Sequence, residues 1–119
     1  MLNRVRQPFN VSLPAQAAAA AALGDAEFLE ETLQVVHQGV DYLHAALTGL
    51  GFECRPTQAN FLMFRVPGDA RQVFEGLLDR GVIVRPLASY GYPDRIRVSA
   101  GLPEENRRFI ESLRQVLRL

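Results

Sequence analysis

Apolar residues between Asp25 and Gly51 recur at alternating spacings of four and three, and this periodicity most limits what the chain can fold into. The stripe consists of Leu29, Leu33, Val36, Val40, Leu43, Leu47 and Leu50. Such spacing places all of these side chains on one face of an α-helix. Asp25 is a suitable N-cap and Gly51 a suitable terminator, so the sequence predicts one helix of about 25 residues. A helix of this length suits the role of bracing a whole sheet.

The N-terminal part is different in character. Residues 1–14 contain Pro8 and Pro14 and show little periodicity, so we expect an extended arm. The alanine-rich run at residues 15–23 has the highest intrinsic helix propensity available, and Gly24 follows where a C-cap would lie. We expect this short helix, with its small side chains, to pack closely against another surface. The predicted division is therefore an arm at 1–14 and a domain at 15–119.

The remaining elements are predicted from composition and capping signals. We expect strands at residues 52–55, 60–66, 82–85 and 95–99, and helices from Asp69 to Gly81 and from Pro103 to the C-terminus. The segment 86–94 is dense in Pro, Gly, Ser and Asp, which is typical of a loop. Pairs of strands between helices predict an α+β sandwich of the ferredoxin-like kind, with a mostly antiparallel sheet and helices packed on one face.

Composition excludes several classes of partner. A chain of 119 residues suits one core, and 13 basic residues against 13 acidic ones leave a formal net charge of zero. No positive field favours nucleic acid or an anionic membrane, and no apolar run approaches the length of a membrane span. We therefore expect a cytoplasmic protein that binds neither. All 13 basic residues are arginine, so the chain contains no lysine.

The residues that most often carry metal or nucleophilic chemistry give no such signal here. His37 and His44 lie seven apart on the long predicted helix, about 10 Å along its axis, which is too far to share one metal ion. Cys54 has no neighbouring activator in the sequence and is expected to be a small buried hydrophobic residue. We predict no metal-binding residue and no catalytic residue in this chain.

Three polar residues stand out by their positions on predicted strands: Asn60 begins one, Arg85 ends another and Arg97 lies inside a third. An arginine within an apolar strand is costly to bury unless it is paired, and its planar fork suits a carboxylate or a phosphate. We expect these residues to converge at one edge of the sheet. The alternatives are that Arg97 pairs with an acidic side chain or faces solvent, and that Asn60 caps a turn. Arg95 is expected to face solvent.

Four blocks of sequence, taken together, are specific to one family. They are NRVRQPFNV in the arm, QANFLMF, RGVIVRPLASYG and RIRVSAGLPEEN. In this order and at these separations they resemble the C-terminal third of the histidinol-phosphate aminotransferase family, and the resemblance covers essentially the whole chain. It implies the small domain of a fold-type I pyridoxal-phosphate enzyme.

The resemblance also implies roles for individual residues. Arg97 matches the arginine that grips the anionic group of the substrate, which is the phosphate of histidinol phosphate or the carboxylate of glutamate. Arg85 matches a second anion contact, and Asn60 matches a position near the cofactor and the substrate. Tyr90 is a candidate lining residue. Implied partners are a phosphorylated amino-alcohol or amino-acid substrate, a large domain and a second copy in a homodimer.

The missing lysine limits what this chain does by itself. The family resembled here binds pyridoxal 5'-phosphate through a lysine of its large domain. Because the chain has no lysine, we expect it to bind no cofactor and to be inactive alone. The alternative to an aminotransferase domain is a freestanding ferredoxin-like module that binds a small molecule or dimerises, because a fold does not fix a function.

Overall fold

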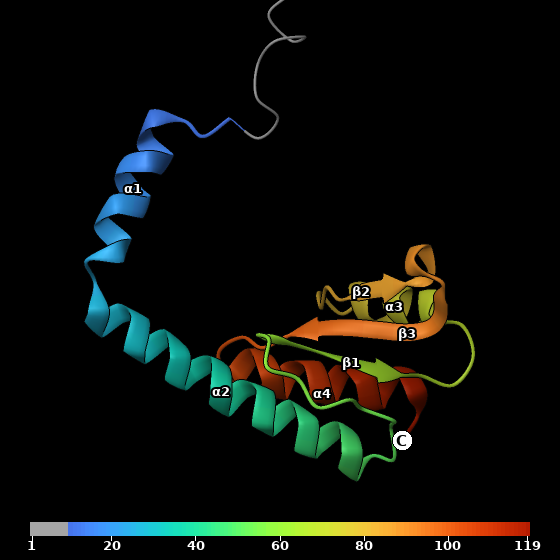
Figure 1. Cartoon of the computed structure of the whole chain (residues 1–119). Coiled ribbons are helices and arrows are strands. Elements are labelled where there is room, and N and C mark those ends of the chain that lie inside the picture. Colours follow the sequence, from blue (N-terminus) through green and yellow to red (C-terminus); the bar gives the residue numbers. More distant parts are fainter. Residues whose placement is uncertain (1–9) are drawn as a thin grey trace, which may run out of the picture. The chain divides into compact units, whose positions relative to one another are not determined.

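The computed structural model describes residues 10–119, and most of the predicted arm lies outside them (Figure 1). Contacts divide the chain into two units, Met1–Thr32 and Leu33–Leu119. The boundary falls inside the helix α2, which runs from Ala26 to Gly49 as the apolar stripe predicts. Within the described residues, no helix combines the length and the apolar character that a membrane crossing requires.

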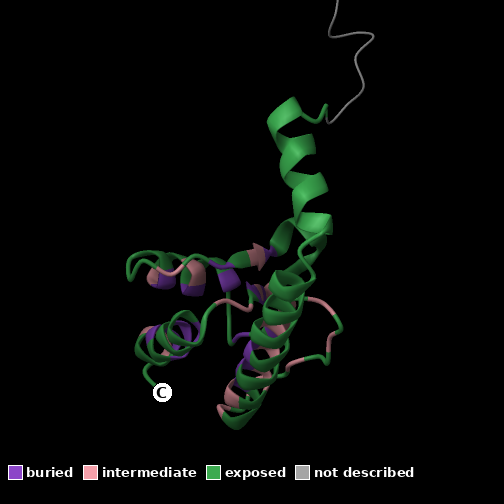
Figure 2. Cartoon of the chain, turned by 90° about the vertical axis from the view of Figure 1, so that its left-hand side faces the viewer, coloured by how far each residue is buried: buried purple, intermediate pink, exposed green. Residues whose placement is uncertain are grey.

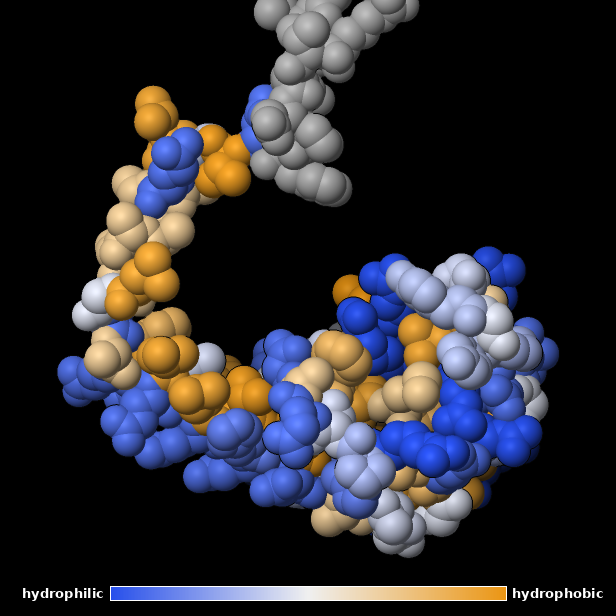
Figure 3. Space-filling model, viewed as in Figure 1, coloured by the Kyte–Doolittle hydropathy of each residue, from blue (hydrophilic) through white to orange (hydrophobic). Residues whose placement is uncertain are grey.

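The first unit contains α1, Leu13–Leu23, and the start of α2. The hydroxyl of Ser12 accepts a hydrogen bond from the backbone N–H of Ala15 at 3.4 Å, and Pro14 lies in the first turn, where a missing N–H costs nothing. The helix therefore begins two residues earlier than predicted, inside the expected arm. All of its described residues are exposed (Figure 2), and its apolar side chains lie on the surface (Figure 3).

The second unit is a three-stranded antiparallel sheet with helices. After α2 come β1 (Phe61–Arg65), α3 (Ala70–Leu78), β2 (Arg85–Leu87), the 3₁₀ turn η2 (Ala88–Tyr90), β3 (Tyr92–Ser99) and α4 (Pro103–Leu117). The strand order is β1-β3-β2, with β3 antiparallel to both neighbours. Strands β1 and β2 are thus parallel to each other and joined through α3, which is the split β-α-β arrangement of ferredoxin-like folds. The predicted α+β class is confirmed.

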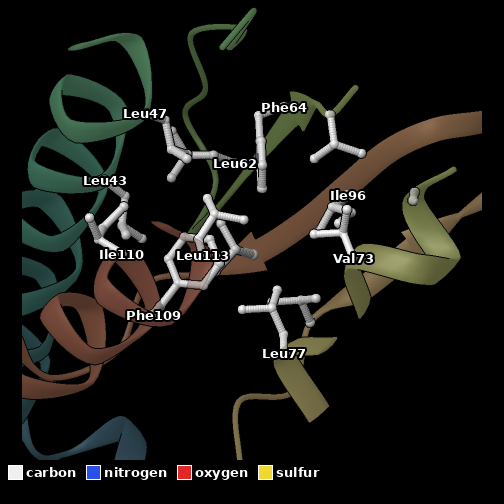
Figure 4. Packing of buried hydrophobic residues seen from close by; sticks show 14 residues of the cluster. Leu43, Leu47, Leu62, Phe64, Val73, Leu77, Ile96, Phe109, Ile110 and Leu113 are labelled. Atoms are coloured by element: carbon white, nitrogen blue, oxygen red, sulfur yellow. The ribbon is translucent and has the colours of Figure 1, made fainter. Parts of the chain in front are cut away.

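One face of the sheet carries the hydrophobic core. Leu62 and Phe64 of β1 and Ile96 and Val98 of β3 are buried, as alternation along a strand requires. Side chains from α2, α3 and α4 converge on them (Figure 4), namely Leu43, Leu47, Val73, Leu77, Phe109, Ile110 and Leu113. The helices that build this core therefore all pack on the same face of the sheet.

Helix α2 approaches α4 closely at a glycine. A Cβ atom on Gly39 would lie 2.9 Å from Nδ2 of Asn106 and 3.1 Å from Cβ of Ala100. Asn106 is buried, and its side-chain amide accepts from the N–H of Gly101 at 3.0 Å and donates to the carbonyl of Gly101 at 2.9 Å. This pairing fixes the chain just after β3, so it also fixes the end of the strand that carries Arg97.

Two predicted strands are wrong in extent. Residues 52–55 form only an isolated bridge between Cys54 and Phe64, although Arg65 N–H donates to the carbonyl of Glu53 at 3.0 Å. Residues 82–84 belong to no strand, and β2 begins only at Arg85.

The predicted loop at 86–94 is also wrong in part. It contains two residues of β2, the turn η2 and the start of β3. The edge position of β2 explains the error, because an edge strand tolerates Pro86 without losing a ladder hydrogen bond.

Candidate functional site

The second face of the sheet is not covered by α3, by α4 or by the part of α2 that builds the core. Its residues alternate with the buried ones along β1 and β3. We call it the open face, and it consists of Phe61, Met63 and Arg65 on β1, Arg95, Arg97 and Ser99 on β3, and Arg85 on β2. Four of these seven residues are arginines, so the open face is the most basic feature of the sheet.

Arg85 and Arg97 are direct cross-strand partners in the register of β2 and β3. Residues that lie opposite one another in this way have their Cβ atoms about 4.5–5.5 Å apart and project from the same face. On the other side of Arg97, its partner on β1 is the uncharged Met63. Within residues 10–119, neither Arg85 nor Arg97 forms an ion pair. The sheet thus places two cations together with no carboxylate between them.

The other two arginines of the open face each form an ion pair, although Arg95 shares its partner Glu53 with Arg55. Arg65 pairs with Asp94, and Arg95 pairs with Glu53 at 3.2 Å. The hydrogen bond from Arg65 lowers the pKa of the Asp94 carboxyl below its ordinary value, so this pair is ionised at neutral pH. Among the four arginines of the open face, only Arg85 and Arg97 therefore lack an acidic partner within residues 10–119.

The prediction for Arg95 was wrong. Its side chain shares the face of Arg97, as the alternation predicts, but it is only 16% exposed and does not face solvent. The isolated bridge between Cys54 and Phe64 holds the segment that contains Glu53 against β1. The Glu53 carboxylate therefore lies next to Arg95. Sequence spacing gives no sign of this pairing, because 42 residues separate the two partners.

Each guanidinium of the Arg85–Arg97 pair lies over an aromatic ring. The Cζ atom of Arg97 is 4.8 Å from the ring centroid of Phe61, and the Cζ atom of Arg85 is 5.5 Å from that of Tyr90. A cation over an aromatic face is held by the ring quadrupole, so both groups are restrained. Sequence reasoning did not single out Phe61, because the apolar residues of β1 occupy both of its faces.

Asn60 lies at the same end of the sheet but is not joined to the pair. Its backbone carbonyl accepts a hydrogen bond from Ala100 N–H at 2.9 Å, which aligns the start of β1 with the end of β3. It directly precedes Phe61, whose ring contacts Arg97. The side chain of Asn60 is exposed and makes no hydrogen bond with the rest of the described chain. The structure thus brings Arg85 and Arg97 together and leaves Asn60 beside them.

The two guanidinium groups lie on a surface and not in a closed pocket. Two cavities of about 710 and 690 Å³ are lined by other residues around Arg65, Asp94 and Pro86. Elsewhere in the unit, burial raises the pKa of the half-buried Cys54 thiol, which disfavours the nucleophilic thiolate. Three or more potential metal ligands gather nowhere in residues 10–119. The chemistry that this arrangement offers is the binding of an anion by two restrained arginines.

Comparison with known proteins identifies relatives over almost the whole chain. The family model for aminotransferase class I and II matches residues 1–113. A histidinol-phosphate aminotransferase of Nitratidesulfovibrio vulgaris is 53% identical over 98% of this chain, which corresponds to 31% of that protein. A histidinol-phosphate aminotransferase 2 of Pseudomonas fluorescens is 50% identical over 98% of this chain and 32% of its own length. The chain therefore spans about a third of the length of these relatives.

Solved structures give the same result for the fold. The histidinol-phosphate aminotransferase of Sinorhizobium meliloti, solved in complex with pyridoxal-5'-phosphate, superposes with a TM-score of 0.83 at 25% identity, over 98% of this chain and 33% of that one. An aminotransferase structure from Burkholderia pseudomallei gives a TM-score of 0.82 at 26% identity, over 96% of this chain and 35% of that one. On both sequence and structure, this chain belongs to the class I and II aminotransferase family.

Proposed function

We propose that this chain is the small domain of a pyridoxal-phosphate-dependent aminotransferase that acts on histidinol phosphate and 2-oxoglutarate, and that its open face holds the anionic group of the substrate. The observation that carries the proposal is the cross-strand pair of Arg85 and Arg97, which meets no carboxylate in the described chain. Relatives about 50% identical carry the name of this activity. The family match over residues 1–113 favours this function over a freestanding small-molecule module.

The role of the two arginines is to bind and orient the substrate. A guanidinium presents parallel N–H donors that match a phosphate or a carboxylate, and two of them offset the charge of a phosphate dianion. Because Phe61 and Tyr90 already restrain the two groups, less side-chain freedom is lost when an anion binds. We infer that the anion lies between Arg85 and Arg97, with Asn60 at its edge. Holding this end fixed directs the amino-bearing end of the substrate away from the sheet.

The residues of this chain do not fit the cofactor. Pyridoxal phosphate supplies the electron sink of amino transfer when a lysine side chain holds it. This chain contains no lysine, so it has no side chain for that attachment. We propose that the lysine belongs to a large domain, and that the open face becomes one wall of the site when such a domain covers it. A homodimer in the cytoplasm is part of the same proposal.

The proposal is tested by joining this chain to the remaining two-thirds of the Nitratidesulfovibrio vulgaris relative, in place of its matching segment. We expect the chimera to transfer the amino group of histidinol phosphate to 2-oxoglutarate. A charge-assisted hydrogen bond contributes about 1.5–3 kcal/mol, so Arg97→Ala should raise the KM for histidinol phosphate roughly 10- to 150-fold. Arg65→Ala is the matched control on the same face and should leave KM unchanged, because Asp94 already neutralises Arg65.

Two results would argue against the proposal. One is a folded chimera that binds pyridoxal phosphate but does not act on histidinol phosphate. The other is an equal rise in KM for Arg97→Ala and Arg65→Ala, which would show that only the overall charge of the open face matters.

A further inference from the structure

Tyr90 contacts Arg85 as Phe61 contacts Arg97, but Tyr90 also carries a hydroxyl group. Its hydroxyl oxygen lies 2.9 Å from Nη2 of Arg85 and accepts a hydrogen bond from it, while the ring lies beside the same guanidinium. Phe61 offers Arg97 a ring alone. The two arginines of the open face are therefore held in different ways, and only Arg85 is held by a residue that has a polar atom of its own.

The O–H of Tyr90 remains free to donate a hydrogen bond. A phenol has one O–H donor and two acceptor lone pairs, and the bond from Arg85 uses an acceptor lone pair. Arg85 retains its other N–H donors, because a guanidinium has five. An oxyanion that binds to Arg85 lies within reach of a hydroxyl 2.9 Å from the same guanidinium. The pair of arginines thus has a neutral third donor next to it.

The backbone around Tyr90 is built to present this hydroxyl. Gly91 follows the turn η2; its φ of 84° lies in the left-handed region, and its N–H donates to the carbonyl of Ala88 at 3.0 Å. A glycine takes this conformation without the strain that a Cβ atom would cause. The turn reverses the chain within the hairpin of β2 and β3. Tyr90 therefore lies beside Arg85 on the open face, although it follows Arg85 by five residues in the sequence.

We propose that Tyr90 positions the Arg85 guanidinium and donates a hydrogen bond from its hydroxyl to a phosphate monoester held between Arg85 and Arg97, which makes Tyr90 a residue that favours phosphate over carboxylate. This inference rests on the proposed function of the open face. A phosphate monoester has three terminal oxygens and, at neutral pH, close to two negative charges. Two guanidinium groups and one hydroxyl match that number of oxygens, whereas a carboxylate has only two oxygens and one charge.

The role of Tyr90 is separable from folding. Tyr90 is 59% exposed and Arg85 is exposed, so their contact lies at the surface and contributes little to stability. Tyr90→Phe removes the hydroxyl and keeps the ring. Tyr92→Phe is a matched control, because Tyr92 is 49% exposed, lies two residues away and has its ring near Arg95, 6.0 Å from Cζ, instead of near Arg85. Both variants should melt at the temperature of the parent chain.

The experiment titrates the 119-residue chain, both tyrosine variants and Arg97→Ala with inorganic phosphate and, separately, with acetate, and follows the arginine side-chain N–H resonances by NMR. The loss of one neutral hydrogen bond should weaken phosphate binding by Tyr90→Phe about 3- to 10-fold. Acetate binding should change by less than that, so the preference for phosphate falls. Without any ligand, Tyr90→Phe should also shift the Nη resonances of Arg85, while Tyr92→Phe should match the parent chain in every measurement.

The outcomes separate this inference from the proposed function. If Arg97→Ala abolishes phosphate binding and Tyr90→Phe binds both anions like Tyr92→Phe, the role of Tyr90 is wrong and the function of the open face stands. An unchanged Arg85 Nη signal in Tyr90→Phe would likewise overturn the positioning role. If phosphate moves neither Arg85 nor Arg97 in the parent chain, both proposals fail together.

Discussion

Arg85 and Arg97 lie directly opposite one another in neighbouring antiparallel strands, on the face of the sheet that carries none of the core. Like charges in this relationship repel and lower the stability of a sheet. Each of the other two arginines on the same face forms an ion pair. The chain therefore carries a local electrostatic cost at one end of the open face, and an anion that binds there removes it.

This repulsion predicts an unusual dependence on salt. Arg85→Gln should raise the free energy of unfolding at low ionic strength by about 0.2–1 kcal/mol, because one of two opposed charges is removed. Salt of about 0.5 M should shrink that difference by screening the repulsion in the parent chain. Arg71→Gln is the control, since Arg71 forms an attractive pair with Glu75, and it should show no such gain. Chemical denaturation across a sodium chloride series measures the free energy of unfolding of both variants and of the parent chain. An Arg85→Gln variant less stable than the parent at low salt would contradict the prediction.

The contact between α2 and α4 predicts opposite effects for two glycines of the same helix. Gly39→Ala should destabilise the domain by about 1–2 kcal/mol, because the new Cβ overlaps the amide of Asn106 and overpacking outweighs the better helix propensity of alanine. Gly49→Ala is the matched control, since nothing lies within 4 Å of its added Cβ. It should be neutral or stabilising by up to about 1 kcal/mol. Equal effects of the two substitutions in urea unfolding would refute the close approach.

The pair of Arg65 and Asp94 predicts a pH dependence of stability. The pKa of the Asp94 carboxyl is lower in the folded chain than in the unfolded one, so its contribution to stability is present at and above the ordinary aspartate pKa. It is lost as the pH falls through the lower, folded-state pKa. Asp94→Asn should therefore be less stable than the parent at pH 7, and the two should converge in acid. A gap that persists unchanged to the lowest pH of the series would speak against this ion pair.

The absence of lysine predicts how the chain responds to the cofactor. Pyridoxal phosphate attaches covalently to a primary amine, and no side chain here supplies one. Equimolar cofactor followed by borohydride should leave residues 2–119 unmodified, as judged by peptide mass mapping. A lysine-containing aminotransferase of the same family serves as the control and should be labelled. Modification of any side chain of this chain would show that the expectation is wrong.

Local patterns in the sequence predicted most of the helices. The stripe from Leu29 to Leu50 gave α2 almost to the residue, and the capping signals at Asp69 and Pro103 gave α3 and α4. The first two residues of that apolar stripe, Leu29 and Leu33, are nevertheless 58% and 46% exposed. Periodicity identifies an apolar face but says nothing of what covers it.

The sheet was harder to predict, because its strands are defined by partners far away in the sequence. Val84 is buried and apolar yet lies outside the ladder, whereas Pro86 pairs with Ile96. The strand β2 therefore starts three residues later than the apolar run around Val84 suggested. Proline-rich composition alone gave no sign of a tight hairpin between Leu87 and Tyr92.

The candidate site was predicted in part. The unusual placement of Arg97 within an apolar strand, together with the family resemblance, identified the arginines before any geometry was known. Their direct opposition depends on the register of β2 against β3, which includes an irregularity between Pro86 and Leu87. The contact of Phe61 with Arg97 depends on the register of β1 against β3, and that of Tyr90 with Arg85 depends on the turn η2, so both became visible only in three dimensions. The division into an arm at 1–14 and a domain at 15–119, and the binding role of Asn60, stay predictions.

The most direct test of the central claim follows the side-chain Nε–H resonances of the arginines while phosphate is added to the 119-residue chain. Arg85 and Arg97 should shift together along one binding curve. Arg65 should stay still because Asp94 accepts from its Nε–H, and Arg95 should stay still because it is only 16% exposed and pairs with Glu53 through Nη2. Equal shifts at all four arginines, or shifts at Arg65 and Arg95 alone, would show that the pair opposed across β2 and β3 is not an anion site.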